Sequence, residues 1–133
     1  MLERWNPDPL HTPPGYHHVT VAQPGRLVAL AGQCPLDRAG DLVGPGDVAV
    51  QARQVAANIA VALDAAGATA SDVVRTVVYV RSDDREDLST VWAVLTASEV
   101  AAAFTSAATL LGVAQLGFPG QLVEVDVTAV LPA

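Results

Sequence analysis

Hydrophobic positions along this chain recur with two different periods, and each period predicts one kind of element. Between residues 48 and 66 apolar side chains return every three or four positions, which is the spacing of one buried helix face. Asp47 stands before this stretch as a candidate N-cap, and Gly67 stands after it, where a glycine commonly ends a helix. The pattern predicts a helix from residue 48 to residue 66.

A second helical stretch begins near Asp83 and Glu86. An acidic residue followed three positions later by a glutamate is a capping pattern that opens helices. The positions behind it predict an amphipathic helix whose C-terminal end the sequence leaves open between Thr96 and Phe104. Its apolar stripe consists of Leu88, Val91, Trp92 and Leu95.

Short runs of β-branched and aliphatic residues predict the strands. Residues 73–80 form the most β-prone run and contain few polar side chains, so we expect them in the centre of a sheet. Residues 17–22 and 27–32 flank a Gln-Pro-Gly-Arg turn and predict a β-hairpin. Two further strands are predicted at residues 109–113 and 122–130.

The order of these elements, β-β-α-β-α-β-β, predicts runs of antiparallel strands in an α+β domain, with two helices covering one face of the sheet. Four prolines before Gly15 predict an irregular lead-in over residues 1–14, and residues 1–133 are expected to form a single domain. The second face of the sheet would stay bare in a monomer. Another copy of the chain is the simplest cover for that face.

Composition and charge narrow the classes of function. Of the 133 residues, 51% are hydrophobic and 16% are charged, so the chain is expected to fold around a core. All seven basic residues are arginine, which excludes a lysine Schiff base and a P-loop lysine. The arginines are scattered and the net charge is −7, which argues against nucleic acid as a partner. Because the sequence shows neither a long apolar run nor a signal-peptide pattern, we expect a cytoplasmic protein without membrane association.

The last predicted strand carries the most informative polar residues. Side chains alternate along a strand, so Glu124, Asp126 and Thr128 share one face and the valines between them share the other. One interpretation is a solvated or subunit-facing polar stripe. The other is a cleft in which one carboxylate positions or activates a water molecule.

Histidine, cysteine and glycine residues near the N-terminus offer further candidates. His17 and His18 are neighbours on a predicted strand and point to opposite faces, so they do not share a metal ion, and no metal or other cofactor is expected. His18 shares a face with Tyr16 and is a site candidate, whereas we interpret His17 as a packed, hydrogen-bonded residue. Cys34 has no recognisable base beside it and is interpreted as a buried inert thiol rather than a nucleophile. Gly32, at a strand end, permits the close approach of a ligand or another chain.

Six motifs stand in order along the chain. They are PGY at 14–16, AGQCPLD at 31–37, QARQ at 51–54, AAGA at 65–68, DVVRTVVYV at 72–80 and LVEVDV at 122–127. Together they resemble the Rid family, the YjgF-like group whose best-known branch is RidA, the reactive-intermediate deaminase that acts on enamines and imines. The resemblance covers about residues 13–131, nearly the whole chain.

The resemblance implies a chorismate-mutase-like α+β fold and a homotrimer whose sheets form a barrel, with ligand clefts between the subunits. In the RidA branch a glutamate near the start of the last strand helps to place the hydrolytic water, and Glu124 matches that glutamate. Tyr16 matches a tyrosine of the cleft, and Gly32 matches a position where the backbone lines the cleft.

The arginine that grips the substrate carboxylate in the RidA branch has no counterpart here. Counting back from Leu116 and Glu124 puts Ala108 at its position and Leu110 where some members carry a cysteine. Ser89 matches an asparagine of the second helix. Ala108 cannot replace a bidentate arginine–carboxylate contact, so an imino acid of the 2-aminoacrylate type is not expected as the preferred substrate.

Two functions of different classes follow from the resemblance. The first is a hydrolase or deaminase acting on a small, reactive, more apolar or uncharged substrate such as an enamine, imine or related metabolite. Glu124 and Tyr16 would be its catalytic residues and His18 a hydrogen-bonding group. The alternative is a non-catalytic trimer that binds a small molecule or stabilises a partner protein. Ribonuclease activity, proposed for relatives, is disfavoured by the charge of −7.

Overall fold

The apolar stripe at residues 48–66 forms α1 (Val48–Ala65) in the computed structural model, which describes residues 2–133. Asp47 is its N-cap, because its carboxylate accepts hydrogen bonds from the backbone N–H groups of Ala49 (3.1 Å) and Val50 (3.0 Å). Gly67 has a φ of +76°, the left-handed conformation that glycine adopts at little cost after a helix. The predicted start of this helix is confirmed, and its end lies one residue earlier than predicted, with Ala66 as the C-cap.

The second helix, α2 (Arg85–Thr96), begins slightly later than predicted. Its N-cap is Asp84, so the prediction of Asp83 as the cap is wrong. Asp84 has the extended backbone that lets its carboxylate accept from the Glu86 N–H at 2.9 Å. The predicted apolar stripe packs into the core, with Leu88, Val91, Trp92 and Leu95 as its members.

Four strands form one mixed sheet in the order β3, β6, β4, β5. Their bounds are Gly25–Ala29 for β3, Val73–Arg81 for β4, Ala107–Val113 for β5 and Val123–Pro132 for β6. The apolar β4 lies in the interior of the sheet, as predicted. It pairs antiparallel with β6 but parallel with β5, so the expectation of runs of antiparallel strands is wrong for that pair. The segment with α2 supplies the long crossover that a parallel pair requires.

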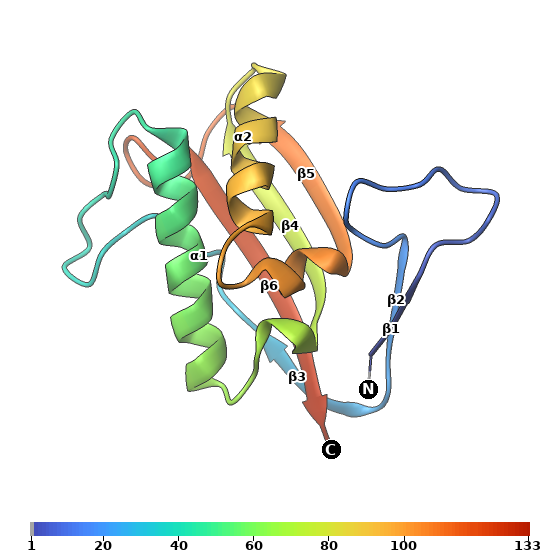
Figure 1. The fold of residues 1–133 in the computed structure, drawn as a ribbon. Coiled ribbons are helices and arrows are strands. Elements are labelled where there is room, and N and C mark those ends of the chain that lie inside the picture. The colour runs from blue at the N-terminus through green and yellow to red at the C-terminus, as the bar shows by residue number, and fades with distance from the viewer. Residues whose placement is uncertain (1) are drawn as a thin grey trace.

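Figure 1 shows α1 and α2 over the same face of this sheet. Two short 3₁₀ helices, η1 (Ala70–Asp72) and η2 (Ala101–Thr105), precede β4 and β5. The predicted α+β class, with two helices covering one face of a sheet, is confirmed. Within residues 2–133, no helix combines the length and the apolar character that crossing a membrane requires.

The predicted N-terminal hairpin of residues 17–22 and 27–32 is wrong. The first predicted strand forms β2 (Val19–Ala22), which pairs with β1 (Leu2–Trp5) in a separate two-stranded sheet. The second half, β3, pairs with β6. Gly25 approaches the backbone of Leu131 so closely that a Cβ would overlap its carbonyl oxygen, so β3 joins β6 from its first residue.

Strand β1 lies within the predicted irregular lead-in of residues 1–14. Its side chains alternate between half-buried and exposed, which is the pattern of an edge strand. The chain is irregular from residue 6 to residue 18, where the prolines lie. Met1, the first residue of the predicted lead-in and domain, is outside the described residues.

The two-stranded sheet is fastened beside the start of β5. Arg4 donates from Nε to Ser106 Oγ at 2.8 Å and from a terminal nitrogen to the Ser71 carbonyl oxygen at 3.0 Å. Thr20 Oγ1 accepts from the Ala107 N–H at 2.9 Å. These hydrogen bonds fix β1 and β2 next to the edge of the four-stranded sheet.

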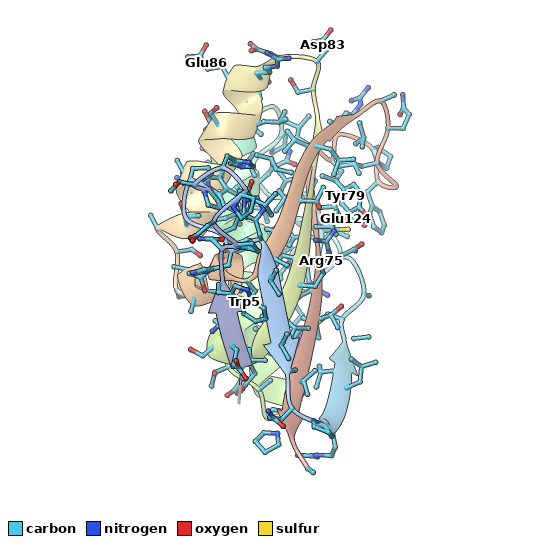
Figure 2. All side chains as sticks on the ribbon, turned by 90° about the vertical axis from the view of Figure 1, so that its right-hand side faces the viewer. Trp5, Arg75, Tyr79, Asp83, Glu86 and Glu124 are labelled. Carbon is cyan, nitrogen blue, oxygen red and sulfur yellow. The ribbon has the colours of Figure 1, made fainter. Side chains whose placement is uncertain are left out.

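The four-stranded sheet has one covered and one open face. Val123, Val125 and Val127 of β6 are buried beneath the helices, whereas the half-buried Glu124 and Asp126 alternate with them and point to the other side. Figure 2 shows Arg75, Tyr79 and Glu124 on the side of the sheet away from α2. Leu27 of β3 belongs to the open face and is 71% exposed. The bare face expected from the sequence is therefore present in the single chain.

Candidate functional site

A cavity of about 220 Å³, which we call the Tyr16 cavity, lies where the N-terminal segment meets the edge of the sheet. Pro14 and Tyr16 come from the irregular segment, Trp92 comes from α2, and Ala108 and Leu110 come from β5. All five side chains are apolar or aromatic, and the Tyr16 hydroxyl is the polar group among them. Three predicted site residues, Tyr16, Ala108 and Leu110, are thus brought together.

Two histidines stand behind Tyr16. His11 Nε2 lies 3.2 Å from the Tyr16 hydroxyl, and His18 Nε2 donates to the His11 carbonyl oxygen at 2.8 Å. The Tyr16 ring meets the His18 ring edge to face at a centroid distance of 5.9 Å, and it meets the Trp92 ring in the same way at 6.3 Å. These contacts fix the Tyr16 ring in the cavity wall, and His18 contacts that wall through the Tyr16 ring.

A second set of side chains, which we call the Glu124 group, consists of Glu124, Gln121, Cys34 and Gly32. Glu124 Oε1 accepts from Gln121 Nε2 at 3.1 Å and lies 3.4 Å from Cys34 Sγ. Gly32 lies against the other carboxylate oxygen, because a Cβ at position 32 would overlap Oε2 and come within 2.9 Å of Cδ. The absence of a side chain at Gly32 makes room for this carboxylate. The predicted site residues Glu124 and Gly32 are therefore in contact.

Cys34 is held as a protonated thiol. Burial, followed by the hydrogen bond to Glu124 and the negative charge of Glu124, raises the pKa of Cys34 to about 11, and the nearby Gln121 amide opposes this shift. A thiol with such a pKa is a weak nucleophile near neutral pH, because the thiolate is the reactive form. Cys34 is only partly buried, but its pKa agrees with the interpretation as an inert thiol.

Tyr79 and Asp126 form another contact on the open face. The Tyr79 hydroxyl donates to Asp126 Oδ2 at 3.1 Å, and this hydrogen bond, with burial and the Asp126 charge, raises the pKa of Tyr79. Arg75, on the same strand as Tyr79, donates to Thr109 Oγ1 at 2.8 Å. The Arg75 head group is thus engaged with β5 rather than with the Glu124 carboxylate.

The Tyr16 cavity and the Glu124 group lie on opposite faces of the sheet. Ala108 is paired with Thr76 of β4, which is buried beneath the helices. Glu124 is paired with Tyr79, three positions further along β4. Successive side chains of a strand alternate between its two faces, so positions 76 and 79 point to opposite sides. One chain therefore holds both halves of the predicted site without joining them.

Two other residues singled out in the sequence lie apart from both halves. Ser89, predicted to bind substrate, is exposed on α2 and does not belong to the lining of the Tyr16 cavity in the described part of the chain. His17 Nδ1 forms a short hydrogen bond with the Thr105 carbonyl oxygen and is half-buried. This contact agrees with the interpretation of His17 as a packed, hydrogen-bonded histidine.

The sequence did not indicate Gln121 or Trp92 as parts of these two groups. Gln121 follows a loop rich in glycine and proline, and no pattern shows that it is buried. Trp92 belongs to the predicted apolar stripe of α2, and its ring packs on Phe104 at a centroid distance of 5.9 Å. The size of the Trp92 side chain is the one sequence signal for its place in the cavity wall. An indole at a helix surface can reach beyond the core to a neighbouring segment.

Comparisons with known proteins agree on the family. The profile of a family described as Endoribonuclease L-PSP matches residues 10–131. The 2-iminobutanoate/2-iminopropanoate deaminase of Escherichia coli K12 is 38% identical over 68 residues, which are 50% of this chain and 50% of that protein. A RutC family protein of Haemophilus influenzae is 39% identical over 64 residues, 48% of each chain. Each match spans about half the length of these curated relatives.

Solved structures resemble this chain over a greater length. YyfB of Yersinia pestis, a Rid family protein of unknown function, has a TM-score of 0.87 and 32% identity, with 98% of both chains covered. The YjgF gene product of Escherichia coli has a TM-score of 0.67 and 32% identity, with 86% of this chain and 87% of that chain covered. The profile match, the identity and the shared fold together place this chain in the Endoribonuclease L-PSP family, the YjgF-like or Rid group of proteins.

Proposed function

We propose that this protein hydrolyses small, uncharged imines, and enamines through their imine tautomers, in a site shared by two copies of the chain. One observation carries the proposal: the Glu124 group and the Tyr16 cavity lie on opposite faces of one sheet. A second copy packed on the open face can bring its own cavity next to the Glu124 group. The site is then complete only in the assembly.

A homotrimer is the proposed assembly. The open face carries exposed apolar surface, including Leu27, together with the half-buried carboxylates of β6, and such a face is stabilised by a partner. The likeness to the Rid family implies a trimer whose sheets form a barrel. Closed cyclic symmetry would give three identical shared sites, each with one Glu124 group and one Tyr16 cavity.

In the proposed reaction Glu124 acts as a general base and the Tyr16 hydroxyl as a hydrogen-bond donor to the imine nitrogen. Glu124 accepts a proton from water while the water oxygen attacks the imine carbon, and the π electron pair moves to the nitrogen, which takes a proton from solvent. The carbinolamine nitrogen then takes the proton held by Glu124, the C–N bond breaks to release ammonia, and the hydroxyl proton passes to solvent as the carbonyl group forms. The balance is R₂C=NH + H₂O → R₂C=O + NH₃, and water is the co-reactant.

The proposed preference for uncharged substrates comes from the wall of the Tyr16 cavity. Its lining is apolar or aromatic, and Ala108 offers no positive charge at the position where the resemblance expects an arginine. The Escherichia coli relative is named for 2-iminobutanoate and 2-iminopropanoate, which are carboxylates. A carboxylate in this cavity would lose water without gaining a charged partner, which is costly. The net charge of −7 also disfavours RNA as a substrate.

A panel of imines tests this proposal. Imines are generated in the assay from neutral amines by an amine oxidase and from amino acids by an amino-acid oxidase, and their loss is followed by trapping with semicarbazide. We expect the protein to accelerate the loss of neutral imines more than that of carboxylate imines, and light scattering to give the mass of three chains. A ligand that binds without being converted anywhere in the panel would favour the non-catalytic binding or partner-stabilising trimer. A monomer in solution would refute the shared site.

Mixing two inactive variants tests whether two copies build one site. Glu124→Gln removes the proposed base, and Ala108→Trp fills the cavity of about 220 Å³. When the two variants are unfolded and refolded together in equal amounts, about a quarter of the wild-type activity is expected, because half of the chains bring an intact Glu124 and half bring an intact cavity. Each variant refolded alone is the control. A site formed within one chain would give no recovery.

A further inference from the structure

The loop before β6 is held in place by a fully buried glutamine of α1. Gln51 donates from Nε2 to the carbonyl oxygens of Gly44 and Gly120, both at 3.1 Å. Its Oε1 accepts from the Leu122 N–H at 2.7 Å. The backbone on either side of Gln121 is thereby fixed to the first helix, because a buried amide keeps its partners.

Gln121 is a second buried glutamine, 1% exposed, and all its polar atoms are engaged. Its Nε2 donates to the Val123 carbonyl oxygen at 3.0 Å and to Glu124 Oε1 at 3.1 Å, and its Oε1 accepts from the Phe118 N–H at 3.1 Å. A flipped amide would place its oxygen against two acceptors and its nitrogen against a donor. The orientation of the amide is therefore fixed, and one N–H is aimed at one oxygen of Glu124.

Cys34 approaches the same oxygen of Glu124. Its sulfur lies 3.4 Å from Glu124 Oε1 and 3.5 Å from the Gly32 carbonyl oxygen, and its single S–H can donate to one of them. The carboxylate is the stronger acceptor because it is charged. Within residues 2–133, both hydrogen bonds found for this carboxylate end on Oε1, while Oε2 lies against Gly32, in the place that a Cβ at that position would need.

We propose that Gln121, assisted by Cys34, is a positioning residue that holds Glu124 by Oε1 and so leaves Oε2 as the atom that takes the proton from water. Neither residue touches the substrate in this proposal, and both act through Glu124. The role of Oε2 as a base rests on the hydrolase function proposed above. The arrangement of the three side chains does not depend on that function.

The rate at which iodoacetamide alkylates Cys34 reports this arrangement without any substrate. Cys34 is the single cysteine of the chain, so mass spectrometry of the intact protein measures its alkylation directly. Alkylation requires the thiolate, and the Glu124 charge and hydrogen bond disfavour the thiolate. Wild type, Gln121→Met, Gln51→Met and Glu124→Gln are compared at about pH 8.5, where a thiol with a raised pKa reacts slowly.

The expected order of alkylation rates shows whether Gln121 positions the Glu124 carboxylate or only supports the loop before β6. Glu124→Gln should speed alkylation roughly three- to tenfold, because the nearby negative charge is gone while burial remains. Gln121→Met should slow alkylation about twofold or more, because the Gln121 N–H no longer offsets the charge of Glu124 and Cys34 becomes the remaining hydrogen-bond partner of Oε1. Gln51→Met, the matched control, loosens the same loop without touching Glu124 and should not slow alkylation.

Faster or unchanged alkylation in Gln121→Met would overturn the proposal, because a residue that only supports the loop exposes the thiol when it is removed. If Gln121→Met does not fold, the side-chain amide resonances of Gln121 are compared in wild type and in Glu124→Gln by NMR. We expect the signals to move, and unmoved signals would also overturn the proposal.

Turnover supplies the test of Oε2 as the base. On a neutral imine that the wild type hydrolyses, Gln121→Met should lower kcat about tenfold with little change in KM, and an unchanged kcat would refute positioning of the base. If the alkylation order holds and no imine is hydrolysed, the hydrolase function fails while the arrangement of the three side chains stands. If imines are hydrolysed and the alkylation order fails, this inference fails alone.

Discussion

Replacement of Glu124 by glutamine is expected to lower kcat for a neutral imine by about 10²- to 10³-fold, with little change in KM, which is the contribution typical of a general base. The amide has almost the same shape as the carboxylate and can still contact its neighbours, but it does not take a proton from water. The Gly32 backbone, which leaves room for this side chain, is not disturbed. Steady-state release of ammonia from an imine generated in the assay measures the effect.

Asp126→Asn is the matched control for this substitution. Asp126 lies two residues along the same strand and on the same face, but its carboxylate accepts from the Tyr79 hydroxyl at 3.1 Å. We expect kcat for this variant to stay within about threefold of wild type, as for a residue that makes no contact in the transition state. An unchanged kcat in Glu124→Gln would show that the proposed base is the wrong residue. An equal loss of kcat in Asp126→Asn would show that the effect comes from the total negative charge on the open face of the sheet.

Ala108→Arg is expected to raise kcat/KM for 2-iminopropanoate by about 10- to 100-fold and to lower it for neutral imines. A charge-assisted, bidentate arginine–carboxylate contact contributes about 1.5–3 kcal/mol, which corresponds to this range. Position 108 lines the Tyr16 cavity, so the guanidinium would lie where a bound carboxylate needs a partner. Initial rates with imines of the same size, one neutral and one with a carboxylate, measure the change of preference.

Thr109→Arg adds the same charge one position further along β5 and serves as the control. Its side chain belongs to the face opposite the Tyr16 cavity, where Thr109 now accepts from Arg75. No gain on 2-iminopropanoate is expected from this variant, since its guanidinium lies on the other side of the strand. Equal gains in both variants would indicate a general attraction of anions, and no gain in Ala108→Arg would mean that the cleft has been rebuilt more widely than at this one position.

Features that depend on neighbouring residues were predictable from the sequence. The two ends of α1 follow from Asp47 and Gly67, whose side chain and backbone act within one turn of the helix. The start of α2 was missed because two aspartates are adjacent, and the extended backbone of Asp84, rather than its residue type, makes it the cap. Local patterns therefore predict the positions of the helices, but they do not predict which of two adjacent aspartates is the N-cap.

Strand partners were less predictable because pairing joins distant segments. The pattern of residues 17–22 and 27–32 is that of two strands beside a turn, but it does not show that β1 and β6 offer each of them another partner. The parallel pair of β4 and β5 likewise depends on the path of the crossover and not on either strand alone. The alternation that places Glu124 on the polar face of β6 was predictable, since it needs only the period of a strand.

The sequence indicates most residues of the candidate site, but it does not show that they lie on two opposite faces of the sheet. The resemblance to the Rid family indicated Glu124, Tyr16, Gly32, Ala108 and Leu110. Their division between two faces follows from the registers of β4 with β5 and β6. Gln121 could not be found, because a buried polar residue becomes recognisable only when the loop that buries it is known.

The separation of the Glu124 group from the Tyr16 cavity has an evolutionary consequence in the proposed trimer. Substitutions that reshape the cavity leave the packing around the carboxylate of the same subunit intact, so substrate preference can diverge while the proton-transfer machinery is preserved. After a gene duplication, two diverged paralogues that still recognise each other could assemble mixed rings. Such a ring would contain more than one kind of site, with the base supplied by one paralogue and the selectivity by the other.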